Sequence, residues 1–338
     1  MSKEIWLSPV LGNSRERLVN RSAEMIRRGE THRFLYLTSS HPLLELVTKW
    51  ILDFDTLRGV MGTLPIFLFR GFVRHILTSA RYADSGLALP RRTPIDTEES
   101  QLKKSLLSQV MRRLVANGEL AALAPLAHRD GTVNTIATLI GEIQRAAKRP
   151  DEFQAIIERR ATDLNFEEKQ AALVDELEIK TLPRQLDFDR EIALIYDAYS
   201  KSLDRFLLTE QDADQLRALE VFQGEVGSRE ISTAWLEEVD LLILDGFFDF
   251  TPVQGEILRR LIPRVPNVVV NLYGDMENEE VFRPFAETVA QLRSMSDEFG
   301  EPIPQAPDTD RALVAIRTRL FNPEFVPEAR DVEPSRIN

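Results

Sequence analysis

Apolar runs and amphipathic segments alternate along the first part of the chain. Short apolar runs typical of buried strands lie at residues 5–7, 34–38 and 64–69. Segments with the three-to-four-residue spacing of an amphipathic helix follow them, at residues 15–28, 42–52 and 71–82. This alternation predicts a parallel sheet whose strands are joined by crossover helices.

The pattern changes after about residue 85, where strand signals are almost absent. Five helical segments follow one another there, at residues 98–118, 133–148, 152–164, 187–207 and 210–222. Strand and helix patterns then alternate again, at residues 239–245, 252–262, 267–275 and 280–295. We therefore predict an α/β fold in which a parallel sheet domain is interrupted by a large all-helical insertion.

The predicted organisation has four parts. Residues 1–84 and 223–300 form the two parts of the sheet domain, and residues 85–222 form the helical insertion. The prolines between 90 and 94 mark the entry to the insertion, and Pro183 marks a break on the way out. Residues 301–338 hold one more helix, at about 310–321, and a tail rich in proline and charge, so we expect the chain to be truncated from a longer protein.

Composition limits the kinds of site that the chain can hold. The 338 residues are 43% hydrophobic and include no cysteine, which excludes disulfides, thiolate catalysis and cysteine zinc sites. The four histidines share no ligand spacing, so we expect no metal site. No apolar run is long enough for a membrane span, and we expect a cytoplasmic protein without membrane contact.

The net charge of −12 is unevenly distributed. Residues 1–160 carry 24 Lys and Arg and 17 Asp and Glu, a net charge of +7, whereas the remaining residues carry 18 and 37, a net charge of −19. Only the first half therefore has an electrostatic reason to contact nucleic acid. A solvated basic face explains the same charge equally well, because the basic residues form no dense cluster.

The loop after the first predicted strand has the position of a phosphate-binding loop but lacks its residues. Such a loop needs Gly-x-x-x-x-Gly-Lys-Ser/Thr, because glycine amides surround the phosphates, the lysine reaches the outer phosphates and the hydroxyl holds magnesium. Aligned by strand and helix, the four required positions are occupied here by Ser8, Asn13, Ser14 and Arg15.

The altered loop keeps some properties of a phosphate site. Gly12 and Asn13 can form a tight turn, since asparagine tolerates left-handed dihedrals. Arg15 can attract an anion at the start of a helix. Without the lysine and the magnesium hydroxyl we expect no productive hydrolysis of a triphosphate. An ordinary strand-to-helix turn is the alternative interpretation.

The apolar run that ends on Asp245 is followed at once by Gly246. In a nucleotide-hydrolysing site the aspartate at the end of the strand orients hydrated magnesium, and a glutamate directly after it activates water. Gly246 removes that base, and Asp245 alone cannot perform both tasks. A turn in which the Asp245 carboxylate accepts backbone amides is the structural alternative.

The segment that begins at Asp245 resembles a known family. In helicases of the UvrD and RecB type, in superfamily 1, the corresponding segment reads Asp-Glu-Phe-Gln-Asp-Thr-x-x-x-Gln. Four residues keep their places here: Asp245, Phe247, Asp249 and Gln254. The variant "DGFFDFTPVQ" is still more similar to AddB-type subunits of bacterial helicase-nucleases, whose N-terminal region is a degenerate helicase. The resemblance spans residues 4–290 and implies a sheet of the P-loop NTPase or RecA-like type.

Neighbouring segments extend the resemblance. "LYGDMENEEVFR" at 272–283 is similar to the next helicase motif, which adds Asp275 and Arg283 to the degenerate nucleotide site. "LYLTSS" at 35–40 has the place of a motif that contacts single-stranded DNA in the family, which implies DNA contacts for Thr38 and Ser39. Because both catalytic boxes depart from the active pattern, the resemblance implies no cofactor, with binding of ATP and magnesium as an alternative.

The helical insertion has the position of the family's DNA-touching subdomain. The resemblance therefore implies phosphate contacts for the basic residues of two predicted helices. These are Lys103, Lys104, Arg112, Arg113, Arg145 and Lys148. A solvated helix face is the alternative for all of them.

The resemblance implies an inactivated helicase-like region of a subunit that processes DNA double-strand breaks. Its expected partners are single-stranded or duplex-end DNA and an active helicase subunit of the AddA or RecB type. Relatives of full length continue with a second degenerate helicase domain and a C-terminal nuclease domain of the PD-(D/E)xK type. An ATPase with an atypical site and a scaffold that touches only protein are the alternatives.

Overall fold

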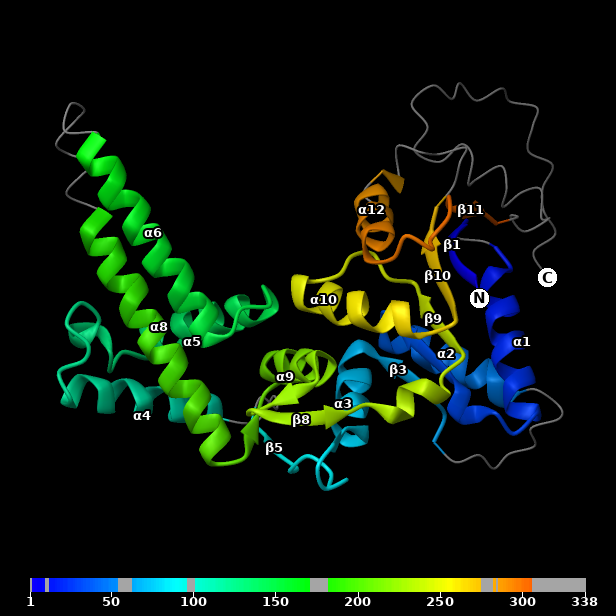
Figure 1. The fold of residues 1–338 in the computed structure, drawn as a ribbon, viewed down its shortest axis with the longest axis horizontal. Coiled ribbons are helices and arrows are strands. Elements are labelled where there is room, and N and C mark those ends of the chain that lie inside the picture. Colours follow the sequence, from blue (N-terminus) through cyan, green and yellow to red (C-terminus); the bar gives the residue numbers. More distant parts are fainter. Residues whose placement is uncertain are drawn as a thin grey trace, which may run out of the picture. The chain divides into compact units, whose positions relative to one another are not determined.

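The computed structural model describes residues 2–9, 12–53, 63–95, 101–170, 182–274, 282–283 and 285–305. The chain divides into two compact units. The first combines Met1–Ala80, Ile231–Phe250 and Gly255–Asn338, and the second combines Arg81–Glu230 and Thr251–Gln254. The first unit contains a parallel sheet, and the second is mainly helical (Figure 1).

Six parallel strands form the sheet of the first unit. In chain order they are β1 (Ser2–Ser8), β2 (Phe34–Thr38), β3 (Ile66–Leu68), β9 (Leu241–Asp245), β10 (Asn267–Tyr273) and β11 (Ile303–Pro304). Their order across the sheet is β11-β1-β10-β9-β2-β3. All residues of the neighbouring interior strands β9 and β2 are buried, as expected for parallel strands that are covered on both faces.

Helices accompany the sheet in the order that the sequence pattern predicts. They are α1 (Ser14–Arg27), α2 (His41–Leu52), α3 (Phe69–Ser79), α10 (Pro252–Leu261) and α12 (Phe285–Met295), with short 3-10 turns at Thr31–Arg33, Ala234–Glu238 and Ile262–Arg264. Buried side chains of α1 and α2, such as Leu18 and Val47, pack against Tyr36 of β2 and Ile243 of β9. This packing fixes the start of α1 beside the carboxyl edge of the sheet.

The second unit is built around helices that share one apolar core. Within the described residues, the helices of this unit are α4 (Leu102–Ala116), α5 (Asp130–Arg145), α6 (Pro150–Gln170), α8 (Leu182–Arg205) and α9 (Gln211–Gln223), with a 3-10 turn at Ala124–Leu126. Met111 of α4, Ile140 of α5 and Tyr196 of α8 are among its buried core residues. Figure 1 shows α6 and α8 running side by side as a long pair. The strands β4 (Arg81–Tyr82), β7 (Glu225–Val226) and β8 (Arg229–Ser232) form a small sheet in the order β4-β8-β7, and β7 contacts α9.

The α/β class, the parallel sheet and the five predicted helical segments of the insertion are confirmed. The insertion is, however, not entirely helical, because β5 (Thr93–Pro94) pairs with β6 (Leu208–Thr209). Strands of two residues are too short to give a periodic signal. The helix predicted at 71–82 ends at Ser79, since Ala80 is extended and residues 81–82 form β4. The helix predicted at 310–321 lies outside the described residues.

Candidate functional site

Polar residues gather where the central strands of the sheet end. Asp245 closes β9, and it lies in register with Thr38 of β2 on one side and with Asn271 of β10 on the other. Ser8 closes β1, the strand next to β10. The carboxyl edge of an open parallel sheet is where α/β proteins place their ligand sites.

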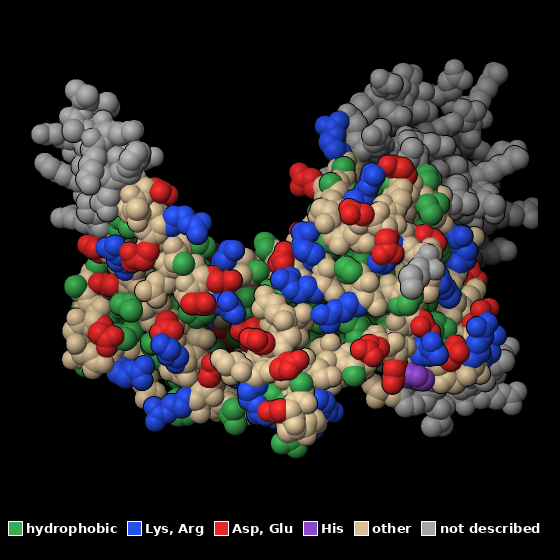
Figure 2. Space-filling view, in the orientation of Figure 1, with side chains coloured by type: hydrophobic (Ala, Val, Ile, Leu, Met, Phe, Trp, Pro, Cys, Tyr) green, Lys and Arg blue, Asp and Glu red, His purple; other side chains and the backbone are tan. Residues whose placement is uncertain are grey.

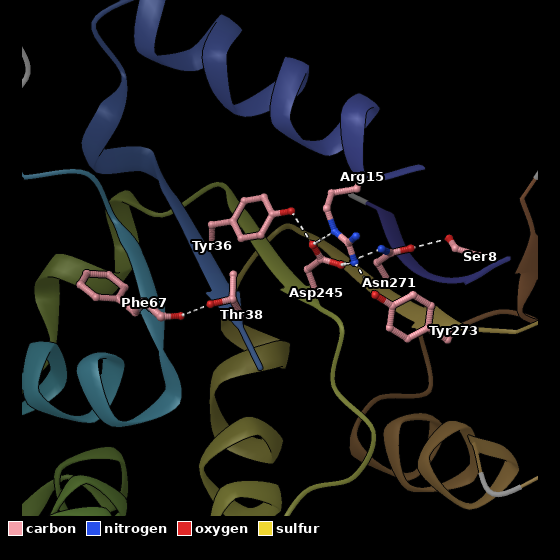
Figure 3. A network of polar contacts seen from close by, with 8 residues as sticks. All are labelled: Ser8, Arg15, Tyr36, Thr38, Phe67, Asp245, Asn271 and Tyr273. Carbon is pink, nitrogen blue, oxygen red and sulfur yellow. Dashed lines mark hydrogen bonds and ion pairs between the residues drawn. The ribbon is translucent and has the colours of Figure 1, made fainter. Parts of the chain in front are cut away.

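The carboxylate of Asp245 is fully buried and accepts four hydrogen bonds from side chains. Its Oδ2 accepts from Nε of Arg15 at 2.8 Å and from the hydroxyl of Tyr36 at 2.9 Å. Its Oδ1 accepts from Nδ2 of Asn271 at 2.7 Å and from Nη2 of Arg15 at 3.2 Å. A carboxylate offers about four acceptor positions, so this one is saturated by the protein itself. Figure 3 shows these donors converging on Asp245.

Arg15 supplies the positive charge of this network. Its side chain is 17% exposed and its guanidinium also donates through Nη2 to the hydroxyl of Tyr273 at 3.0 Å. Burial alone would lower the pKa of Arg15, but the hydrogen bond and the charge of Asp245 outweigh it and raise that pKa. Burial, followed by the charge of Asp245, raises the pKa of Tyr36 well above its ordinary value of 10.0. The Tyr36 hydroxyl therefore stays protonated and donates.

The first loop differs from its expected geometry. Asn13 precedes α1 with φ −92° and ψ 9°, so it does not use the left-handed region, and Gly12 has no positive φ either. Ser14 is buried at the first position of the helix. The guanidinium of Arg15 is not directed toward an external anion, because its side chain reaches across the edge of the sheet and pairs with Asp245 (Figure 3). From the sequence we expect Arg15 to be a cation at an exposed helix start. In the structure Arg15 is largely buried, and the acid at the end of β9, Asp245, is its partner.

Gly246 has a structural reason to lack a side chain. Its φ is +75°, which side chains rarely adopt. A Cβ built on it would lie 2.8 Å from Cδ2 of Leu43 and 3.1 Å from Oγ of Ser39. The position that a catalytic glutamate would need is thus closed both by the backbone and by its neighbours.

Two other residues predicted for the nucleotide site, Asp249 and Gln254, do not contact Asp245 within the described residues. Asp249 is exposed. The Gln254 carboxamide oxygen accepts the N–H of Thr251 at 3.1 Å, and the Thr251 hydroxyl accepts the N–H of Gln254 at 3.4 Å, which is a capping box at the start of α10. Arg283 is exposed, and Asp275 lies outside the described residues.

Two residues predicted to contact DNA lie at the end of β2. Thr38 is fully buried, and its hydroxyl donates to the carbonyl oxygen of Phe67 at 3.4 Å, so its side chain is not available to a DNA strand. Ser39 is exposed, and its N–H donates to the carbonyl oxygen of Asp245 at 3.2 Å.

The basic residues of the helical unit fall into two groups. Lys103 pairs with the buried Glu210 at 2.6 Å, and Arg145 pairs with Asp212 at 2.9 Å. These ion pairs join helices of the unit and leave less charge for an external anion. The remaining four are exposed and form no ion pair within the described residues: Lys104, Arg112, Arg113 and Lys148.

Lys104 and Arg112 line a groove between α4 and α5. The groove has a volume of about 490 Å³, and its polar lining includes Ser105, Ser108 and Gln109 from the same side of α4. Asp130 at the start of α5 is the one acid that lines it among the described residues. On the face of the molecule seen in Figure 2, basic and acidic side chains are mixed. The groove is the candidate surface for a nucleic acid, because Lys104 and Arg112 both line it.

Sequence reasoning missed three members of the Asp245 network: Tyr36, Asn271 and Tyr273. The two tyrosines lie in apolar runs and resemble core residues. Asn271 gave a usable signal, because a carboxamide inside the buried run "VVVNLY" must find a hydrogen-bond partner.

Two further features bear on the class of site. In the described part of the chain, no helix is both long and apolar enough to cross a membrane. The same residues contain no group of three or more His, Asp or Glu that could hold a metal ion.

Comparisons with known proteins give one consistent family. The family model described as "ADDB, N-terminal" matches residues 96–313, which is more than half of the chain. The sequence is 23% identical over 201 residues to an ATP-dependent helicase/deoxyribonuclease subunit from Ruminiclostridium cellulolyticum, and 22% identical over 196 residues to the protein of the same name from Acetivibrio thermocellus. The matches cover 58% and 55% of this chain but only 14% of each relative.

Proposed function

Because this chain belongs to the family of AddB N-terminal regions, we propose that it is a helicase-like region that has lost nucleotide hydrolysis and that holds a single DNA strand. In this proposal residues 1–84 and 223–300 are a sheet domain of the P-loop or RecA-like type, and residues 85–222 are the insertion that touches DNA. The position of the first loop and of Asp245 at the same edge of the sheet supports the comparison with P-loop proteins.

The observation that carries the loss of nucleotide hydrolysis is the Arg15–Asp245 pair. An active site needs a strand-end carboxylate that is free to orient the water shell of magnesium. Here the four acceptor positions of Asp245 are taken by Arg15, Tyr36 and Asn271. The guanidinium of Arg15 supplies the positive charge that a metal ion would bring. Magnesium and the carboxylate could meet only after a buried ion pair had been broken.

Magnesium and ATP are therefore expected to leave the melting temperature unchanged. A ligand present at a hundredfold excess over its Kd would stabilise the chain by about 2.7 kcal/mol, which a melting curve resolves readily. The measurement is the melting of tryptophan fluorescence with and without millimolar Mg-ATP. It reports on the sheet unit, because Trp6, Trp50 and Trp235 all belong to it. A saturable rise in melting temperature that Arg15→Met abolishes would instead show ATP binding at this site and would support the alternative of an ATPase with an atypical site.

The groove between α4 and α5 is the feature that supports a DNA-holding role. Lys104 and Arg112 lie eight residues apart, about 12 Å along the helix axis, and neither is neutralised by a partner among the described residues. Serine and glutamine side chains between them can donate to phosphate oxygens. Both charges can thus replace the counterions of a DNA strand. The affinity for DNA should therefore depend strongly on salt concentration.

A single DNA strand is expected to bind through this groove. Arg112→Ala should weaken binding of fluorescent oligo(dT) and reduce the slope of log affinity against log salt by roughly 0.7, the value for one phosphate contact on a single strand. Arg113→Ala is the matched control, because it removes the same charge from the next position of α4, outside the groove. Asp130→Asn should tighten binding, since it removes the acid that opposes a phosphate. Fluorescence anisotropy at several salt concentrations measures all three.

Two results would count against the DNA-holding role. One is equal affinity and equal salt slope for Arg112→Ala and Arg113→Ala, which would make the groove an ordinary surface. The other is no binding of oligo(dT) at low salt, which would favour a scaffold that touches only protein.

The remainder of the proposal concerns the longer protein. The relatives are named as subunits of a helicase and deoxyribonuclease, and this supports a partnership with an active helicase subunit of the AddA type in the repair of DNA breaks. A second degenerate helicase domain and a C-terminal nuclease domain would then lie in the part of the relatives that this chain does not match.

A further inference from the structure

The helical unit contains a second cavity that shares no lining residue with the α4–α5 groove. Its volume is about 620 Å³, within the range of small-molecule sites, roughly 300 to 1,000 Å³. Arg92, Gln144, Arg217 and Glu220 are among the residues that line it, and all of them belong to the second unit. The cavity therefore depends on one compact unit alone.

Three polar atoms of this lining have no hydrogen-bond partner within the described residues. They are Nε of Arg92, Nε of Arg217 and Oε1 of Gln144. Gln144 is 2% exposed, and the hydroxyl of Tyr196, which also lines the cavity, donates to the carbonyl oxygen of Lys148 at 2.9 Å. Buried polar atoms are nearly always paired, so these three point to a ligand. Two of them are donors and one is an acceptor, so that ligand must offer an acceptor and a donor.

The charges around the cavity favour an anionic acceptor. Burial, and then the charge of Arg92, lowers the pKa of Arg217, and Arg217 has no ion pair among the described residues. Arg92 uses Nη2 for the exposed Asp204 at 2.7 Å and Nη1 for the carbonyl oxygen of Leu208 at 3.4 Å, so the buried Nε is its one nitrogen without a partner among the described residues. Burial raises the pKa of Glu220, which favours the neutral form of one of the four acids in the lining, the others being Asp151, Asp197 and Asp204. An anion beside Arg92 and Arg217 would relieve their repulsion, and guanidinium groups match phosphate geometry well.

We propose that this cavity binds a nucleoside monophosphate unit, whose phosphate contacts Arg92 and Arg217 while an N–H of its base donates to Oε1 of Gln144. The unit can be a free nucleotide or the terminal nucleotide of a DNA strand, because the two present the same groups. The assignment goes beyond the DNA-holding groove and does not depend on it, since no lining residue is shared.

Isothermal titration calorimetry on the 338-residue chain tests the assignment with dCMP, inorganic phosphate and deoxycytidine as ligands. We expect dCMP to bind more tightly than phosphate, and deoxycytidine to bind least. Arg217→Met keeps the length of the side chain and should weaken dCMP and phosphate about tenfold or more, the effect of one charged hydrogen bond. Gln144→Leu should weaken dCMP by a similar factor and leave phosphate unchanged. Arg113→Ala is the control for an exposed charge outside the cavity.

The source of the nucleotide is identified by competition. Displacement of dCMP by a 5′-phosphorylated oligo(dC), but not by the unphosphorylated strand, assigns the cavity to a strand end. No displacement by either strand assigns it to a free nucleotide. Circular dichroism melting establishes that each variant keeps its helical fold. The assignment is wrong if neither dCMP nor phosphate binds the unaltered chain, or if both folded variants bind dCMP as the unaltered chain does.

Discussion

Replacing Arg15 by methionine is expected to lower the free energy of unfolding of the sheet unit by about 3–5 kcal/mol, the usual cost of removing one partner from a buried ion pair. Asp245 is fully buried, so its charge would lose the guanidinium without gaining water. Tyr36 and Asn271 would still donate to it, but neutral donors compensate a charge only in part. Tyr273 would lose its donor as well.

Urea denaturation followed by tryptophan fluorescence measures this loss. Arg21→Met is the matched control, because Arg21 is exposed on the same helix, and exposed substitutions usually change stability by less than about 0.5 kcal/mol. The double variant Arg15→Met with Asp245→Asn should recover at least about 1 kcal/mol relative to the sum of the single effects, since the two residues are in direct contact. Additive effects would mean that the pair contributes no specific stability.

The organisation of the chain could be predicted because its signals are local. Buried parallel strands such as "FLYLT" and "LLILD" are continuous apolar runs, and the helices that follow them have apolar residues at helical spacing. The short strands β5 and β6 gave no such signal, because a two-residue strand has no period. Their pairing joins residues 93 and 208, which are distant in sequence.

The candidate site was predictable in position but not in chemistry. Asp245 at a strand end and the loop before Arg15 are visible in the sequence, and both lie at the same edge of the sheet. That the arginine turns toward the aspartate depends on two segments that lie 230 positions apart along the chain. The same limit applies to Lys103, because its partner Glu210 is distant from it in the sequence.

Gln254 illustrates a signal that the sequence did contain. Its agreement with the helicase pattern suggested a place in the nucleotide site. Thr251 and Gln254 also have the spacing of a capping box directly before an apolar helix, which is a local and physically complete explanation. The hydrogen bonds of both residues correspond to that box. A motif residue with a sufficient local role carries little evidence for a ligand.

Restoring the missing glutamate by Gly246→Glu is expected to destabilise the sheet unit by about 3 kcal/mol and to restore no ATP hydrolysis. A side chain at a φ of +75° costs roughly 1–2 kcal/mol, and forcing a Cβ within 2.8 Å of the buried Leu43 adds roughly 1–3 kcal/mol of overpacking. The new carboxylate would find Asp245 saturated and Arg15 already paired. A general base without a magnesium ion beside it cannot complete the site.

Two alanine variants separate the causes of this loss. Gly29 has a φ of +77° and no atom within 4 Å of a Cβ built on it, so Gly29→Ala measures the backbone strain alone. Gly246→Ala adds the contacts with Leu43 and Ser39, and its larger destabilisation gives their cost. Urea denaturation and a phosphate-release assay with Mg-ATP complete the comparison. If Gly246→Glu were as stable as the unaltered chain and hydrolysed ATP, Arg15 would not be what closes the site, and the missing glutamate alone would account for its inactivity.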